Sequence, residues 1–159
     1  MKVVPAADLH IPEMVEIWKE FMDFHSDIDP FFKRREDGHE NFVRMVKDWI
    51  GSEDSHVLVA LEGGRVIGYS VSIVLRHPPV LNTERYGFIN DLAVRSIHRR
   101  KGAGTALLME MFRWFRSVNV DRVELQVVPK NRIGCRFWEK HGFRDYIHVL
   151  AHPVPDVDG

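Results

Sequence analysis

The chain has 159 residues, of which 45% are hydrophobic and 28% charged, and its 22 basic and 23 acidic side chains leave a formal net charge of -1. This balance excludes an overall positive field that would recruit nucleic acid or an anionic membrane, and the length fits one domain. The single cysteine, Cys135, excludes an internal disulfide and indicates a reducing compartment, so we expect a cytoplasmic protein.

The first half of the chain predicts a strand, two helices and a hairpin. Residues 1–4 are apolar enough for a short strand, and Asp8 is placed to cap an amphipathic helix that runs to about Ser26. A second amphipathic helix is expected at about residues 40–50. Two β-rich runs on either side of a Gly-Gly turn then predict a hairpin over residues 56–75.

The second half predicts three more strands and two more helices. A strand over residues 86–94, a helix over 102–118 and a strand over 123–128 follow one another in the order of a parallel crossover. A last helix is expected over residues 131–142, with a glycine at its end, and a final strand over residues 143–150.

A loop before the third helix combines positive charge with glycine. The first N–H groups of a helix have no partner within the helix, and the aligned peptide dipoles favour an anion there. Glycines let the backbone approach a pyrophosphate closely, and cations add attraction. The loop therefore predicts a phosphate site, although such a run can also be a solvated basic turn. It holds Arg99, Arg100, Lys101, Gly102 and Gly104.

Two common phosphate-binding motifs do not fit this loop. A dinucleotide fingerprint requires a third glycine where Leu107 stands, three residues after Gly104. A Walker loop requires a lysine after its last glycine, but Thr105 follows Gly104 directly. The loop is therefore not expected to bind a dinucleotide, and the protein is not expected to be an ordinary nucleotide triphosphatase.

The R-x-x-G-x-G arrangement of residues 99–104, which follows the strand FINDLAV, resembles the acyl-CoA loop of the GNAT superfamily of N-acetyltransferases. The segment NRIGCRFWEKHGF at residues 131–143 is similar to the family pattern N-x-x-A-x-x-x-Y-x-x-x-G-F. The resemblance spans nearly the whole chain. It implies a single-domain α/β acyltransferase fold over residues 1–152, with a central mixed β-sheet and about four helices, followed by a C-terminal tail at 153–159.

The resemblance also implies acetyl-CoA as the cofactor and direct attack of a primary amine on its thioester. A backbone N–H near Leu92 would then stabilise the developing oxyanion. Asn131 stands where the family has an asparagine that bonds the CoA chain, and it fits the N-cap of the last helix equally well. The residues that the resemblance places against acetyl-CoA are Leu92, Ala93, Val94, Arg99, Arg100, Lys101, Gly102, Ala103, Gly104, Thr105 and Asn131.

The catalytic base is a departure from the family pattern. Relatives often carry a carboxylate where Asn90 stands, and an amide cannot accept the proton. Asp91 is the next carboxylate, and strict strand alternation would point it to the face opposite Asn90. It would act directly, through water, or only as a structural residue. Glu84, Glu124 and Tyr86 are alternatives.

The acid is a second departure. The family's tyrosine near the CoA sulfur corresponds to Trp138, whose indole N–H donates a hydrogen bond but is no useful acid. Protonation would come from solvent or Tyr146, and Trp138 fits simple core packing equally well. Cys135 has no evident His or Asp partner as a nucleophile. A second interpretation is therefore an acyl-CoA-binding sensor or interaction domain with reduced turnover.

The acceptor is expected to be an amine of a small molecule or peptide. In the family, the segments that correspond to residues 24–37 and 76–87 determine the acceptor. Carboxylates and aromatic faces there would hold an ammonium group, although the first segment also fits a solvated turn. The candidate acceptor-binding residues are His25, Asp29, Phe31, Phe32 and Tyr86.

Other partners are not expected. The nine histidines show no ligand-like spacing, so no metal is predicted. Balanced charge and the lack of a long apolar run predict no nucleic-acid and no membrane partner. The final strand, over residues 143–150, could pair across a two-fold axis to form a homodimer.

Overall fold

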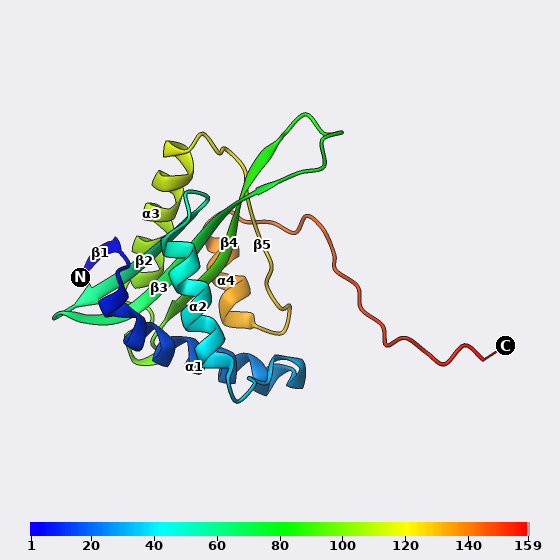
Figure 1. Cartoon of the computed structure of the whole chain (residues 1–159), viewed down its shortest axis with the longest axis horizontal. Coiled ribbons are helices and arrows are strands. Elements are labelled where there is room, and N and C mark those ends of the chain that lie inside the picture. The colour runs from blue at the N-terminus through cyan, green and yellow to red at the C-terminus, as the bar shows by residue number, and fades with distance from the viewer. Residues whose placement is uncertain (159) are drawn as a thin grey trace. The chain divides into compact units, whose positions relative to one another are not determined.

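The computed structural model describes residues 1–158, which form two compact parts, 1–126 and 127–158 (Figure 1). The first part holds the whole β-sheet and three α-helices, and the second holds one more α-helix. None of the helices in this described stretch is long and apolar enough to cross a membrane.

Five strands form one mixed sheet in the order β1-β2-β3-β4-β5. The neighbours from β1 to β4 are antiparallel, whereas β5 lies parallel to β4. The predicted α/β fold with a central mixed sheet is therefore confirmed. The strands are β1 (Lys2–Pro5), β2 (Ser55–Glu62), β3 (Arg65–Arg76), β4 (Arg85–Val94) and β5 (Val123–Leu125).

Helices cover both faces of the sheet. On one face, Ile17 and Phe42, from the first two helices, share a buried cluster with Val71 of β3. On the other face, Trp114 of the third helix stacks on His56 of β2, with 5.2 Å between ring centroids. The four expected helices are α1 (Ile11–Ile28), α2 (Gly38–Ile50), α3 (Ala103–Ser117) and α4 (Arg132–Lys140).

The start of α1 differs from the prediction. Asp8 lies in a single 3-10 turn (Asp8–His10), and His10 rather than Asp8 is the N-cap of α1. Pro12 occupies the first turn, where its missing N–H would have had no partner within the helix. The proline thus sets the start of the helix, and the expected cap at Asp8 was wrong.

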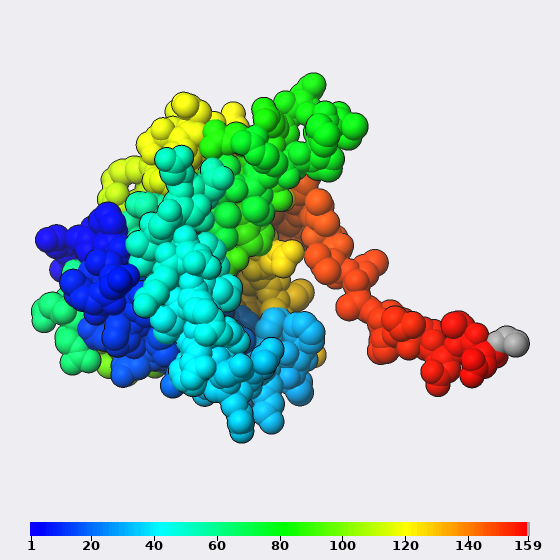
Figure 2. Space-filling view, viewed as in Figure 1, coloured from blue at the N-terminus to red at the C-terminus, as the bar shows by residue number. Residues whose placement is uncertain are grey.

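The β3 and β4 strands form a long hairpin. Its tip, residues 77–84, has no regular structure, as the two prolines predicted. The backbone N–H of His77 donates to the carbonyl of Glu84 at 2.9 Å and closes the base of the tip. Figure 2 shows the tip standing out from the body of the 1–126 part.

The predicted final strand is absent. Residues 141–158 contain neither helix nor strand, and β5 ends at Leu125, before the expected Val128. A strand needs a neighbour for its backbone N–H and C=O groups, and across residues 1–158 no strand pairs with residues 143–150. Side chains in this stretch are accordingly exposed, Leu150 to 91%. Apolar alternation gives a preference for a strand but supplies no partner.

The dimer and the domain boundary stay predictions. The homodimer rested on the strand that is absent, over residues 143–150. The single domain over 1–152 and the tail over 153–159 are likewise predictions, and Gly159 lies outside the described residues.

Gly87 of β4 lies under Phe115 of α3, and we expect Gly87→Ala to destabilise the fold. An added Cβ would lie 2.5 Å from a ring carbon of Phe115. The ring or the helix must then move, at a cost of about 1–3 kcal/mol in the free energy of unfolding measured by urea titration. Gly51→Ala is the control, because its nearest atom would be 3.5 Å away. Equal losses in the two variants would contradict the close packing.

Candidate functional site

The pairing of β4 changes along its length. On one side, β4 pairs with β3 as far as Val94, which lies opposite Gly68. On the other side, pairing with β5 covers only three positions and stops at Ile89 and Leu125. Residues 90–94 of β4 therefore have no strand on that side within the described chain. The backbone groups on that side have no strand partner there, and among them the Val94 carbonyl accepts a hydrogen bond from Arg99 Nε at 3.4 Å.

A β-bulge marks the point where this pairing stops. Asp91 lies opposite Val71 and Ile89 lies opposite Ser72, so Asn90 is an extra residue in β4. The Asn90 side-chain amide donates to Asp91 Oδ1 at 3.0 Å. The prediction that strict alternation separates Asn90 and Asp91 onto opposite faces was wrong, because the bulge interrupts the alternation.

Asp91 also accepts a hydrogen bond from the core. The hydroxyl of Tyr69, a side chain with no exposed surface, donates to Asp91 Oδ2 at 3.0 Å. Burial raises the pKa of Asp91 above its ordinary value, and the two hydrogen bonds partly oppose this. Burial and the adjacent carboxylate hold the pKa of Tyr69 well above its usual range, so it remains a donor. Asp91 is thus a carboxylate with increased proton affinity.

The backbone next to Asp91 faces the unpaired side. The N–H of Arg95 donates to the carbonyl of Ile67 at 2.8 Å, and Val94 lies opposite Gly68. In an antiparallel ladder, bonding alternates from residue to residue, so this register turns the N–H and C=O of Leu92 and Val94 away from β3. The N–H and C=O of Leu92 therefore face the side of β4 that has no strand beside it within residues 1–158.

The basic loop leads into α3 through a backbone that favours glycine. Gly102 is the N-cap of α3 with φ +89°, and no side chain caps this end of the helix. The first turn of an α-helix carries a partial positive charge from its aligned peptide dipoles. Arg100 and Lys101, immediately before the cap, are exposed. Positive charge from two side chains and from the start of α3 therefore lies at one end of the loop.

Arg99 differs from the two cations that follow it. Its guanidinium lies 5.6 Å from the ring centroid of Phe24 in α1. Its Nε donates to the carbonyl of Val94 at 3.4 Å. Arg99 is therefore held by the protein, while Arg100 and Lys101 reach into solvent.

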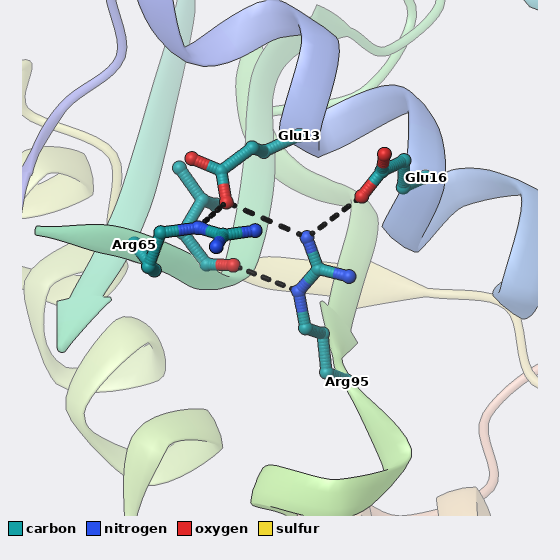
Figure 3. Close-up of polar contacts among 5 residues, drawn as sticks. Glu13, Glu16, Arg65 and Arg95 are labelled. Atoms are coloured by element: carbon teal, nitrogen blue, oxygen red, sulfur yellow. Dashed lines mark hydrogen bonds and ion pairs between the residues drawn. The ribbon is translucent and has the colours of Figure 1, made fainter. Parts of the chain in front are cut away.

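Carboxylates of α1 hold the segment that precedes the loop (Figure 3). Arg95, whose side chain is 19% exposed, donates from Nε to the Val66 carbonyl at 2.9 Å and pairs with Glu16 at 3.2 Å. Glu13 lies 3.6 Å from Arg95 and 2.8 Å from Arg65. The hydrogen bond from Arg65 lowers the pKa of Glu13. These charge pairs connect α1, β3 and the end of β4.

A further α1 carboxylate binds the same segment through its backbone. The N–H of Ser96 donates to Glu20 Oε1 at 2.7 Å. Exposed ion pairs contribute little individually, typically ~0–1 kcal/mol, but several contacts from one helix restrict one short loop. These contacts therefore restrain Arg95 and Ser96, at the start of the basic loop.

The candidate acceptor residues near the end of α1 and in the turn that follows it include an aromatic cluster. His25 is buried, and its Nδ1 donates to the Phe21 carbonyl at 2.9 Å. Its ring lies 5.7 Å from that of Phe32, whereas Phe31 is 84% exposed. Asp29 Oδ1 accepts from the Phe31 N–H at 3.0 Å. The structure brings these four residues together, with Phe31 as the exposed aromatic face.

Three candidates remain: Tyr86 for acceptor binding, and Glu84 and Glu124 as alternative bases. Tyr86 stacks on His77 at the base of the hairpin tip, with 4.1 Å between ring centroids. Glu84 pairs with Arg76 at 2.7 Å, and Glu124 pairs with Arg122 at 3.1 Å. Within residues 1–158, Asp91 differs from both glutamates because its partners are the uncharged side chains of Tyr69 and Asn90 and no ion pair.

Residues 127–158 hold the remaining candidates. Asn131 is the N-cap of α4, and its Oδ1 accepts from the Gly134 N–H at 2.9 Å. Trp138 packs against Phe143, with 5.2 Å between ring centroids, while Tyr146 is 70% exposed. Asn131 therefore does cap α4, and Trp138 does pack against another aromatic ring, as the alternative interpretations predicted. Their roles toward CoA stay predictions.

Sequence reasoning missed Tyr69 and the α1 carboxylates. The only signal for Tyr69 is a phenol inside an otherwise apolar strand, where a buried hydroxyl needs a partner. Glu13, Glu16 and Glu20 recur at three- and four-residue spacing, which puts them on one helix face. Neither signal names the partner.

Comparisons with known proteins agree with this geometry. The family model that matches the chain is described as the acetyltransferase (GNAT) family and covers residues 14–143. An N-alpha-acetyltransferase of Sulfurisphaera tokodaii is 30% identical over 122 residues, which are 72% of this chain and 69% of that protein. Two other curated relatives match over shorter stretches, and the chain spans 36% and 24% of their lengths.

Solved structures share the fold. The tetramutant of the BH1408 protein from Bacillus halodurans has a TM-score of 0.88 at 22% identity, over 97% of this chain and 100% of that one. A predicted acetyltransferase with acetyl-CoA from Clostridium acetobutylicum has a TM-score of 0.76 at 19% identity, over 96% and 95% of the two chains.

The raised pKa of Asp91 predicts how its removal changes stability. Above about pH 4 the unfolded carboxyl is ionised, and burial makes that ionisation unfavourable in the folded protein. We therefore expect Asp91→Asn to have a higher Tm than the unmodified protein at neutral pH. The difference should shrink as the pH falls through the raised pKa towards 4, where the native carboxyl becomes neutral. Thermal unfolding followed by circular dichroism measures both values, and a lower Tm for the variant at neutral pH would contradict the assignment.

Proposed function

The chain belongs to the acetyltransferase (GNAT) family, and we propose that it transfers the acetyl group of acetyl-CoA to a primary amine of a small molecule or peptide. The observation that carries this proposal is the side of β4 that has no partner strand at residues 90–94 and leads into the uncapped start of α3. Amide groups of a pantetheine chain can pair with the backbone of β4 on this side, and phosphates can bind at the start of α3.

The chain's own residues fit that cofactor. Backbone groups of Leu92 and Val94 face the side without a strand, with Ala93 between them. Arg100 and Lys101 supply charge beside the phosphates, while Arg99 holds the loop. The rest of the proposed contacts are Gly102, Ala103, Gly104 and Thr105 at the start of α3, together with Asn131.

We assign separate roles in the transfer to three groups of β4: the Leu92 N–H, Asp91 and Asn90. When bound, acetyl-CoA supplies a thioester whose carbonyl carbon an amine can attack directly. Leu92 N–H donates to the oxygen on which negative charge develops. Asp91 accepts the proton that the amine nitrogen loses, directly or through one water. Asn90 orients Asp91 and does not take the proton itself.

The proton for the departing sulfur has two proposed sources. Solvent or Tyr146 protonates it, and the indole N–H of Trp138 donates a hydrogen bond to it. Solvent suffices because a thiol has a pKa of about 8.5, so its thiolate leaves readily at neutral pH and is then protonated by water.

An amine of low pKa is the acceptor that suits this site. The name of the Sulfurisphaera tokodaii relative favours an α-amino group. We propose that His25, Asp29, Phe31 and Phe32 form one wall of the acceptor site and that Tyr86 lies on the hairpin side. The single cysteine fits a reducing compartment, and we propose that the enzyme acts in the cytoplasm.

Binding of acetyl-CoA tests the cofactor. We expect calorimetric titration to detect acetyl-CoA but not NADH, and we expect the double variant Arg100→Gln with Lys101→Gln to bind about threefold to tenfold more weakly, since it loses two attractions to phosphate. The control is Arg44→Gln with Lys47→Gln, which removes two exposed charges from α2. Equal affinity of the two double variants would refute the loop assignment. Tight binding without turnover of any amine would favour the sensor interpretation.

Turnover of a panel of amines tests the acceptor and the base. At about pH 7.5 an amine of pKa about 10.4 is neutral in roughly one molecule per thousand, whereas an α-amine of pKa about 7.8 is neutral in about a third. We therefore expect α-amines to react faster than lysine side chains. Asp91→Asn should lower kcat/KM by about 10²-fold, and Asp48→Asn, on exposed α2 surface, should not. A strong preference for lysine side chains or polyamines, with Asp91→Asn fully active, would contradict both assignments.

A further inference from the structure

The contacts around Asp91 identify a residue outside the sequence motifs described above. We infer that Tyr69 is a positioning residue, which acts with Asn90 to hold the Asp91 carboxylate in one orientation, at the point where β4 loses its β5 partner. The inference rests on the proposed role of Asp91 as the base, and the structural contacts below support it independently of activity.

Two donors approach Asp91 from different strands. Tyr69 lies in β3 and donates to Oδ2, while Asn90 lies in the β4 bulge and donates to Oδ1, both at 3.0 Å. A carboxylate with one donor on each oxygen cannot rotate about its terminal bond without breaking a contact. The pair therefore fixes the plane of the carboxylate and leaves the other lone pairs for a proton.

Tyr69 itself cannot move easily. Its ring has no exposed surface and lies 5.8 Å from the ring of Phe42 in α2, within the same buried cluster as Val71. A buried hydroxyl without a partner would be unfavourable, so the contact with Asp91 also satisfies Tyr69. The core thus supports the orientation of a group at the edge of the site.

Three carboxylates and one histidine of α1, which packs over this face, have other partners. Glu13 and Glu16 pair with arginines, Glu20 accepts from the Ser96 N–H, and His25 donates to the Phe21 carbonyl. From α2, the aromatic ring of Phe42 contacts Tyr69. Hydrogen bonds from Tyr69 and Asn90 are therefore the local interactions that favour the ionised form of Asp91.

Loss of the Tyr69 hydroxyl should change the pH dependence of Asp91. Tyr69→Phe keeps the buried ring and removes one donor, so the ionised carboxylate becomes less favourable and Asp91 should titrate at higher pH. We expect the acid limb of kcat/KM to move to higher pH, with about a tenfold loss below the limb and less than about a twofold change on the plateau. Asn90→Ala, at an exposed position, should shift the limb in the same direction.

Carbon-13 NMR of the Asp91 carboxyl provides a readout that does not require turnover. The resonance is assigned by its absence in Asp91→Asn, and its titration midpoint should rise in Tyr69→Phe. Phe42→Leu is the control for altered packing, because it changes the ring next to Tyr69 but keeps the hydroxyl, and its midpoint should rise by less than that of Tyr69→Phe.

The outcomes separate this inference from the proposed function. An unchanged midpoint in folded Tyr69→Phe would overturn the positioning role, and if that variant does not fold, an unchanged midpoint in Asn90→Ala would do so. A raised midpoint in Tyr69→Phe, with the acid limb of kcat/KM unmoved, would confirm the contact but overturn Asp91 as the base that Tyr69 positions. A raised midpoint in a protein that acetylates no amine would refute the proposed function and leave the hydrogen bond standing.

Discussion

Backbone pairing of β4 with β3, without matching pairing to β5, is the constraint on which the candidate site depends. Three positions of β4 pair with β5, and the ladder with β3, interrupted by one bulge, continues as far as Val94. Because unpaired N–H and C=O groups are strong hydrogen-bonding groups, a strand with one such side binds another extended chain or an amide-bearing ligand. The bulge at Asn90 lies where pairing ends, and it turns Asp91 toward Tyr69.

The second requirement is a rigid loop at the end of that strand. The carboxylates of α1 bind the chain from Arg95 to Ser96, and Arg99 rests on Phe24 of the same helix. The loop then enters α3 through Gly102 without a capping side chain. A ligand that binds there does not have to order the loop first, which lowers the entropic cost of binding.

The parts of the structure that depend on local chemistry could be predicted from the sequence. Apolar periodicity located the four helices, a Gly-Gly turn located the hairpin, and closely spaced glycines located the loop in which Gly102 has positive φ. Other parts depend on which strands meet. The bulge is a property of the register between β3 and β4, so Asp91 and Tyr69, 22 positions apart, carry no joint signal in the sequence. The strand predicted at residues 143–150 was wrong for the same reason, since the composition favours a strand but cannot supply a neighbouring strand.

Recognition through the main chain has an evolutionary consequence. A ligand that pairs with the N–H and C=O groups of Leu92 and Val94 makes no demand on their side chains, so mutation there is limited by packing alone. The fold shared with a Bacillus halodurans protein, at a TM-score of 0.88 and 22% identity, is compatible with such tolerance.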